Sequence, residues 1–169
     1  MDDTLAEAHG RLGFLYSMTK QYDKGIAEAE KAVALNPNSA MAHVMLGKTL
    51  SFASRWEESI PQYKKAIRLN PIPPNMYFYS LGVSYCNTGQ YEEAIAWCEK
   101  AVREEPDSLW ARIMMTVVYS MSGRDEEARA EAAEVLRINP KFSLKKSPYK
   151  KKTDRERFLG ALRKAGLRL

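Results

Sequence analysis

Residues 22–38 read YDKGIAEAEKAVALNPN, and residues 91–107 read YEEAIAWCEKAVREEPD. Both stretches begin at a tyrosine, carry alanine or glycine at matched places and close on a proline followed by asparagine or aspartate. Two further segments, RLNPI at 68–72 and RINPK at 137–141, end in the same way. The four prolines, Pro37, Pro71, Pro106 and Pro140, are 34, 35 and 34 residues apart. A fixed period of this size is typical of a repeat array, in which each unit buries its apolar face only against its neighbours.

Within this period, small and large residues alternate at matched places. Glycine or alanine lets two helix backbones approach, and a leucine, methionine or tyrosine fills the gap beside them. The pattern therefore predicts two antiparallel helices in each unit. The small places are Gly13, Gly47, Gly82 and Thr116, then Gly25, Ser59, Ala94 and Ala128; the large ones are Leu12, Leu46, Leu81 and Met115, then Tyr16, Leu50, Tyr85 and Tyr119.

This spacing resembles the tetratricopeptide repeat (TPR) family, whose signature runs L-G-x2-Y, then A, F, A and P. The resemblance covers residues 6 to 140. It implies an all-α fold, a right-handed α-solenoid of four TPR helical hairpins plus a C-terminal capping helix. The expected units are about 6–39, 40–73, 75–108 and 109–142, and residues 141–169 form a basic linker and the capping helix.

The two ends differ in their capping signals. Thr4 and Glu7 form a capping box that predicts the start of the first helix, and nothing precedes it in the repeat frame. Because terminal repeats usually carry a polar cap, we expect this chain to be the C-terminal piece of a longer protein, or its array to be covered by another molecule. At the other end, Thr153 and Glu156 predict a helix that lies over the last repeat. The apolar face of this helix is formed by Phe158, Leu159, Leu162 and Ala165, and Gly166 is expected to end the helix.

The linker KFSLKKSPYKKK contains Phe142, Leu144 and Tyr149, which are expected to pin it to the array. The segment from residue 138 to residue 167 is similar to the end of TPR regions in bacterial multidomain signalling proteins, some of which carry a class III nucleotide cyclase domain. That similarity implies an accessory regulatory segment beside a catalytic or DNA-binding domain.

The charge is uneven. Residues 141–169 hold eleven Lys or Arg against two Asp or Glu, a balance of +9, which leaves −4 for residues 1–140 out of the total of +5. The basic tail is either a solvated face or, less expected, a contact with nucleic acid or anionic lipid through Lys145, Lys146 and Lys150 to Lys152. Two cysteines, Cys86 and Cys98, fit a reducing compartment, and the absence of a long apolar run or a secretion signal favours a cytoplasmic protein. Cys98 is expected to be a buried core residue.

The resemblance also implies a binding surface. In this family the first helix of each repeat lines a concave groove. The inward positions are Glu7, Gly10, Arg11, Phe14, Ser17 and Met18; then Met41, Val44, Met45, Lys48, Ser51 and Phe52; then Met76, Tyr79, Ser80, Val83, Cys86 and Asn87; then Trp110, Ile113, Met114, Val117, Ser120 and Met121. The residues expected to bind a partner are Phe14, Met18, Met41, Met45, Lys48, Met76, Tyr79, Asn87, Trp110 and Met114.

An apolar wall rich in methionine suits an amphipathic helix or another apolar peptide, with Trp110 and Tyr79 as anchors and Asn87 bonding a partner's backbone. Lys48 and Arg11 are nearly its only cations, so the Lys/Asn/Arg carboxylate clamp of some relatives is absent. Two alternatives stay open. Part of the wall is intramolecular core, or the wall or the first helix mediates self-association into a homo-oligomeric scaffold.

Catalytic and metal-binding patterns are missing. His9 and His43 occupy the same repeat position, which places them roughly 8–10 Å apart on adjacent repeats, too far for one tetrahedral metal. No phosphate-binding loop and no nucleophile paired with a base is found. The sequence therefore predicts a protein–protein interaction scaffold rather than an enzyme, with no cofactor and no small-molecule substrate.

Overall fold

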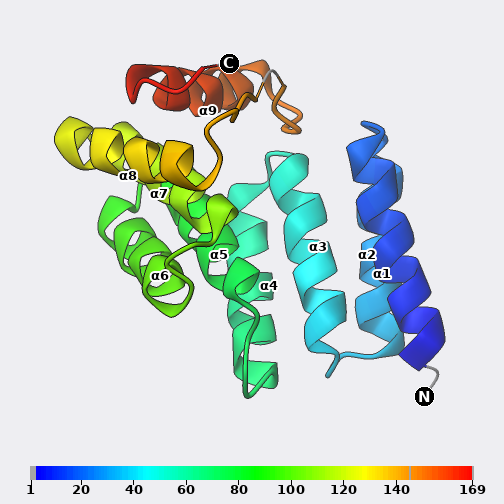
Figure 1. The fold of residues 1–169 in the computed structure, drawn as a ribbon. Coiled ribbons are helices and arrows are strands. Elements are labelled where there is room, and N and C mark those ends of the chain that lie inside the picture. Colours follow the sequence, from blue (N-terminus) through cyan, green and yellow to red (C-terminus); the bar gives the residue numbers. More distant parts are fainter. Residues whose placement is uncertain (1–2, 145, 169) are drawn as a thin grey trace. The chain divides into compact units, whose positions relative to one another are not determined.

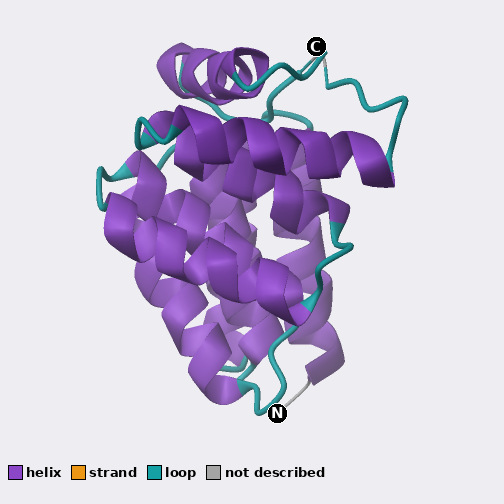
Figure 2. Cartoon of the chain, turned by 60° about the vertical axis from the view of Figure 1, so that its left-hand side comes forward, coloured by secondary structure: helices purple, strands orange, loops and turns teal. Residues whose placement is uncertain are grey.

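The computed structural model of the chain describes residues 3–144 and 146–168. These residues form nine helices and no strand, joined by loops, of which the α8–α9 connection is the longest (Figures 1 and 2). The chain is therefore all-α, as predicted. The helices are α1 (Asp3–Met18), α2 (Tyr22–Leu35), α3 (Ala40–Phe52), α4 (Trp56–Leu69), α5 (Asn75–Asn87), α6 (Tyr91–Glu104), α7 (Leu109–Met121), α8 (Asp125–Ile138) and α9 (Lys152–Lys164).

Consecutive helices pack as hairpins, α1 with α2, α3 with α4, α5 with α6 and α7 with α8. The small residues explain how close they come. A Cβ atom added to Gly13 would lie 2.6 Å from the carbonyl oxygen of Gly25, and one added to Gly82 would lie 2.5 Å from Sγ of Cys98. Neither position has room for a side chain, so the backbones of these helix pairs touch.

The chain divides into two compact units. The first comprises Met1–Pro73 together with Pro148–Lys151, and the second comprises Pro74–Ser147 together with Lys152–Leu169. Helices α1 to α4 thus belong to unit 1, and helices α5 to α9 belong to unit 2. The division after α4 falls in the proline-rich loop PIPP at 71–74.

The core of unit 1 shows how a first helix covers the hairpin before it. Leu46 and Leu50 of α3 pack in one buried cluster with Tyr22, Ile26 and Ala29 of α2, to which Ala53 also belongs. The matched large residues Leu81 and Met115 are buried in unit 2. Leu12 of α1 is different: 39% of its surface is exposed, because no earlier hairpin precedes α1 among the described residues. The expectation that Leu12 fills a helix–helix gap is therefore wrong.

In unit 2, α9 packs against α7. Phe158, Leu162 and Ala165 are buried, Leu159 is partly buried, and Gly166 ends the turn with a φ of +96°, a conformation that favours glycine. Helices α1 and α9 both begin earlier than their capping boxes predict. Helix α1 begins at Asp3, and α9 begins at Lys152, so Thr4 and Thr153 lie inside their helices.

Each hairpin turn contains one residue with positive φ at the same repeat position: Lys20 at 64°, Ser54 at 60°, Gly89 at 81° and Gly123 at 83°. In unit 2 this residue is a glycine. In unit 1 it carries a side chain, and a non-glycine residue in the left-handed region is strained by roughly 1–2 kcal/mol.

Candidate functional site

The ten residues expected to bind a partner all lie on the first helices of the hairpins, α1, α3, α5 and α7. Met18, Met41 and Trp110 are exposed, at 55%, 39% and 48% of their surfaces. The other seven are partly buried. All ten keep some surface that a partner could contact.

Several other inward positions are core instead, in line with the alternative that part of the wall is intramolecular core. They are Gly10, Ser17, Val44, Ser51, Val83, Cys86, Ile113, Val117 and Ser120.

In unit 1, predicted residues from two helices meet around a pocket. The pocket has a volume of about 330 Å³ and is lined by Arg11, Phe14 and Leu15 of α1 and by Met41 and Met45 of α3. Its walls are therefore formed by four apolar side chains and one guanidinium group. Leu15 was missed, because the repeat register places it outside the inward set; its surface is 59% exposed.

Lys48 supplies the cation beside this pocket. Its ammonium nitrogen lies 4.8 Å from the centroid of the Phe14 ring, a cation–π contact. Burial lowers the pKa of Lys48 below its ordinary value of 10.5. Among the residues that the structure describes, no carboxylate forms an ion pair with Lys48, whereas Arg11 pairs with Glu7 at 2.6 Å. Lys48 is therefore a partly desolvated charge that forms no ion pair with a described carboxylate.

In unit 2, the predicted residues lie on α5 and α7. Burial, and after it the nearby Glu105 carboxylate, raises the pKa of Tyr79 to about 12. Asn87 Nδ2 donates a hydrogen bond of 2.9 Å to the carbonyl oxygen of Val83 in its own helix. That donor is already occupied, so one amide hydrogen and the amide oxygen remain for a partner.

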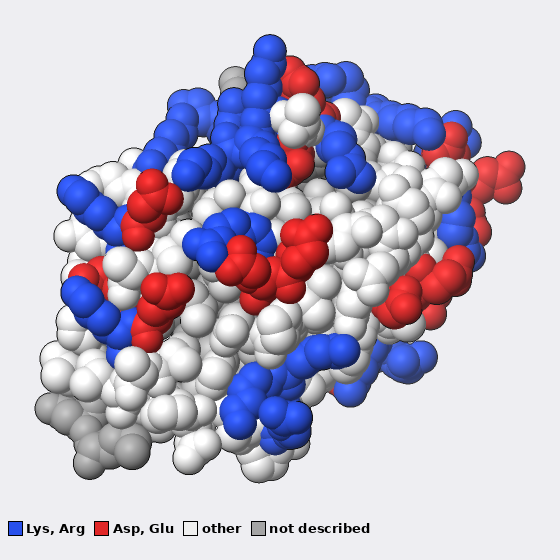
Figure 3. Space-filling view, turned by 180° about the vertical axis from the view of Figure 1, so that it is seen from behind, with Lys and Arg blue, Asp and Glu red and all other residues white. Residues whose placement is uncertain are grey.

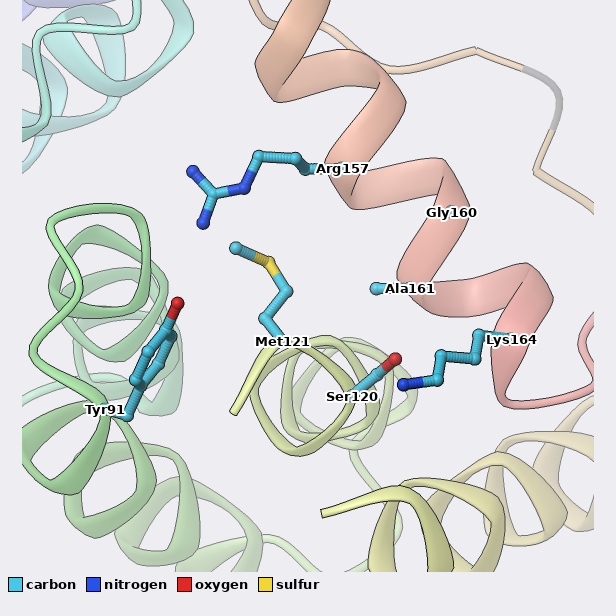
Figure 4. A pocket seen from close by; sticks show the side chains of 7 residues that line it. All are labelled: Tyr91, Ser120, Met121, Arg157, Gly160, Ala161 and Lys164. Atoms are coloured by element: carbon cyan, nitrogen blue, oxygen red, sulfur yellow. The ribbon is translucent and has the colours of Figure 1, made fainter. Parts of the chain in front are cut away.

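A second pocket, of about 290 Å³, lies in unit 2 and is shown in Figure 4. Arg157 and Lys164 extend from α9 toward α7, where Met121 lies between Arg157 and Tyr91 (Figure 4). Lys164 pairs with Asp125 at 2.7 Å. No acid, histidine or cysteine is among the lining residues, which are Tyr91, Ser120, Met121, Arg157, Gly160, Ala161 and Lys164.

The residues considered for metal or thiol chemistry are engaged in packing. His9 Nδ1 contacts Glu28 Oε2 at 2.6 Å, and His43 contacts Gln62 and the Pro37 carbonyl at 2.8 and 2.9 Å. The described residues contain no group of three or more His, Cys, Asp or Glu that could hold a metal ion. Cys86 and Cys98 are free and buried, and burial raises the pKa of both thiols, that of Cys86 to about 12. The expectation for Cys98 is thus confirmed.

Lysine and arginine side chains crowd the top edge of Figure 3, where α9 lies. Some of them have acidic neighbours: Lys150 lies 3.4 Å from Asp23, and Lys152 lies 3.5 Å from Glu156. Lys145 lies outside the described residues. None of the helices in the described part of the chain combines the length and the hydrophobicity that crossing a bilayer requires.

Comparison with known families identifies the class of protein. Tetratricopeptide repeat families match residues 6–39, 44–108 and 88–146. Together these matches span all four hairpins. The chain therefore belongs to the tetratricopeptide repeat family, a family of helical scaffolds for protein interaction.

Solved structures agree with this assignment. MamA is 26% identical, with a TM-score of 0.67, and the match covers 83% of this chain and 81% of that one. TTC0263, a thermophilic TPR protein from Thermus thermophilus, is 22% identical, with a TM-score of 0.72 and coverage of 93% and 81%. YrrB, described as a TPR protein with an unusual peptide-binding site, is 24% identical, with a TM-score of 0.62 and coverage of 93% and 82%. No curated protein matches the sequence.

Proposed function

We propose that this scaffold binds an apolar peptide or amphipathic helix, and that the pocket between α1 and α3 receives it. The observation that carries the proposal is the convergence of Phe14, Leu15, Met41 and Met45 on one accessible pocket in unit 1. Two of these side chains, Leu15 and Met41, are exposed although they are apolar. Exposed apolar surface of this kind is typical of an interaction site.

The composition of the pocket favours an apolar ligand that varies in shape. Methionine has three rotatable bonds and a polarizable sulfur atom, so it adapts to different apolar partners. The Phe14 ring gives the pocket one rigid wall, and this ring also contacts Phe52 at a centroid distance of 5.6 Å. An apolar side chain projecting from a partner helix fits such a pocket.

Lys48 indicates the charge that the ligand carries. Its ammonium group is partly desolvated and forms no ion pair with a described carboxylate. An acceptor on the ligand would supply the missing interaction: a carboxylate, or the free carbonyl groups at a helix C-terminus. We therefore propose an apolar segment with an acidic side chain next to its anchor.

Unit 2 has accessible aromatic side chains of its own, and we propose that a partner also contacts them. Trp110 is 48% exposed, and Tyr79 keeps part of its surface accessible on α5. Aromatic residues contribute more binding energy than most others at interfaces. Replacing Trp110 or Tyr79 by alanine is expected to weaken capture of the partner and leave the helix content unchanged; undiminished capture by both variants would remove unit 2 from the interface.

The decisive experiment selects peptides from a random library on the immobilised chain. We expect selected sequences with an apolar anchor next to Asp or Glu. Met41→Glu should abolish their binding by placing a carboxylate in the pocket. The matched control is Ile72→Glu, because Ile72 is also apolar and 85% exposed but lies in a loop. Equal binding by both variants, or a selection without an apolar anchor, would refute the proposal.

A second candidate function is self-assembly, and the exposed face of α1 is the observation that favours it. Leu5 and Leu12 are exposed there, whereas Leu46, at the position matching Leu12, is buried against α2. A second copy could cover that face. Light scattering over a concentration series separates the two functions, since a monomer at all concentrations excludes self-assembly, and Leu12→Lys should dissociate any oligomer formed through α1.

A further inference from the structure

The short segment Pro148–Lys151 belongs to unit 1, although the chain on both sides of it belongs to unit 2. It lies between α8 and α9 in the sequence and contacts the start of α2, the end of α3 and the start of α4. We call these four residues the strap. The strap is not part of any unit 1 helix. It therefore belongs to unit 1 only through the contacts that its own residues make.

The strap backbone is bound in three places. The Lys150 amide donates to the carbonyl oxygen of Phe52 at 2.7 Å, and the Lys151 amide donates to Ser54 Oγ at 3.2 Å. The Tyr22 hydroxyl donates to the carbonyl oxygen of Pro148 at 3.0 Å. These bonds are made to the backbone of the strap, so they do not depend on the identity of its side chains.

A tyrosine anchors the strap. Tyr149 is only 6% exposed. Its ring meets that of Trp56 edge-on, with the centroids 4.8 Å apart at 73°, and that of Phe52 with the centroids 6.3 Å apart at 69°. Edge-to-face aromatic pairs at such distances contribute about 0.5–1.5 kcal/mol beyond the area they bury. Phe52 and Trp56 thus form a slot that selects an aromatic side chain.

A cation follows the aromatic residue. Lys150 Nζ lies 3.4 Å from Asp23 Oδ1 and 5.7 Å from the centroid of the Tyr22 ring. Both charged groups are exposed, so this contact adds little energy, but it favours a cation over an anion at this position.

We propose that Tyr22, Asp23, Phe52, Ser54 and Trp56 form a second peptide-binding site, specific for a Pro-aromatic-Lys segment, and that the strap is its ligand in cis. Covalent attachment raises the effective concentration of the strap to the millimolar range. A weak site is therefore filled by the tethered segment, and only a partner with the same chemistry at higher local concentration displaces it. This site shares no lining residue with the pocket of the proposed function, although Phe52 contacts the Phe14 ring of that pocket.

The test uses the full chain and a fluorescein-labelled octapeptide, KKSPYKKK, which repeats residues 145–152. Tyr149→Ala empties the slot, and the peptide is expected to bind this variant at least about fivefold more tightly than the wild type, measured by fluorescence anisotropy. Tyr149→Phe keeps the ring and should behave like the wild type. The control peptide KKSPAKKK has the same charge, and we expect it to bind no variant tightly. Two results would overturn the proposal. One is that Tyr149→Ala binds KKSPYKKK and KKSPAKKK with equal affinity. The other is that KKSPYKKK binds the wild type as tightly as it binds Tyr149→Ala.

A second variant and a second readout guard against misfolding of Tyr149→Ala. Lys150→Glu changes only an exposed side chain and places a carboxylate opposite Asp23, so it should increase peptide binding by a smaller factor than Tyr149→Ala. Amide exchange at Lys150 and Lys151 should be slow in the wild type and fast in Tyr149→Ala, while the amides of α3 stay protected. Fast exchange at these two amides in the wild type would show that the strap is not bound. If the wild type is a dimer and Tyr149→Ala is a monomer, the strap binds to a second copy of the chain. That result would refute the assignment of the strap as a ligand in cis.

Discussion

His9 Nδ1 lies 2.6 Å from Glu28 Oε2, and this pair joins the two helices of the first hairpin. The same two repeat positions, 19 residues apart, are paired in every hairpin. His43 bonds Gln62 at 2.8 Å, Arg112 pairs with Glu131 at 2.8 Å, and the rings of Phe78 and Trp97 stack with centroids 5.9 Å apart. The same pair of repeat positions thus forms an ion pair, a hydrogen bond or an aromatic stack, depending on the hairpin.

This pair makes stability depend on pH through Glu28. The hydrogen bond from Lys31, and after it that from His9, lowers the pKa of Glu28 below its ordinary value of 4.5. A carboxyl group with a lowered pKa stabilises the fold above its unfolded pKa, and this contribution disappears as the pH falls through the lowered one. We expect Glu28→Gln to cost about 1–2 kcal/mol at pH 7.

The cost should disappear in acid, below the folded pKa of Glu28. Urea denaturation at neutral pH and in acid measures it, with Glu30→Gln, an exposed glutamate on the same helix, as the control. A Glu28→Gln deficit that stays the same at low pH would show that packing, not charge, causes it.

Lys20→Gly should stabilise unit 1. Lys20 has a φ of 64°, where a glycine is unstrained, so the substitution is expected to add about 0.5–1 kcal/mol to the free energy of unfolding. Lys24→Gly removes the same kind of side chain from inside α2 and should destabilise by about 1 kcal/mol. If thermal unfolding shows both variants to be less stable than the wild type, strain at Lys20 is negligible.

Replacing two glycines of unit 2 by alanine should change the free energy of unfolding in opposite directions. A Cβ at Gly82 would lie 2.5 Å from Cys98 Sγ and 2.9 Å from the Ala94 carbonyl oxygen, so Gly82→Ala is expected to cost about 1–3 kcal/mol. A Cβ at Gly160 in α9 meets nothing within 4 Å, so Gly160→Ala should gain about 0.5–1 kcal/mol. Circular dichroism melting curves compare the two, and a tolerated Gly82→Ala would contradict the tight α5–α6 contact.

Lys48→Met should separate stability from binding. Because burial lowers the pKa of Lys48, the charged form opposes folding below that pKa, and wild-type stability rises as the pH increases from the lowered pKa toward 10.5. Lys48→Met removes this penalty and should raise the free energy of unfolding at pH 7 by about 1 kcal/mol.

The same variant should weaken binding of peptides with an acidic group about tenfold, and leave peptides without one unaffected, as judged by isothermal titration. Lys24→Met, which changes an exposed lysine of unit 1, is the control. If Lys48→Met binds acidic peptides with unchanged affinity, Lys48 does not interact with the charge of the ligand.

The sequence by itself determined the repeat and the hairpin. Gly13, Gly25 and Gly82 mark places where two backbones touch, and Cys98 marks a core position, because each unit repeats one local helix–helix contact and the residues that permit it recur with the period of the chain. The family and the all-α class follow from these local contacts.

Tertiary structure alone decided which residues are covered. Leu12 and Leu46 occupy the same repeat position, but among the residues that the structure describes only Leu46 packs against a preceding hairpin. Val44 and Met45 are adjacent inward positions, yet Val44 is core and Met45 lines the pocket. Tyr149 lies more than ninety residues from Trp56 in sequence and still packs against it. Burial depends on neighbours that are distant in the chain. A periodic pattern predicts only the contacts that recur in every repeat, not a contact that occurs once.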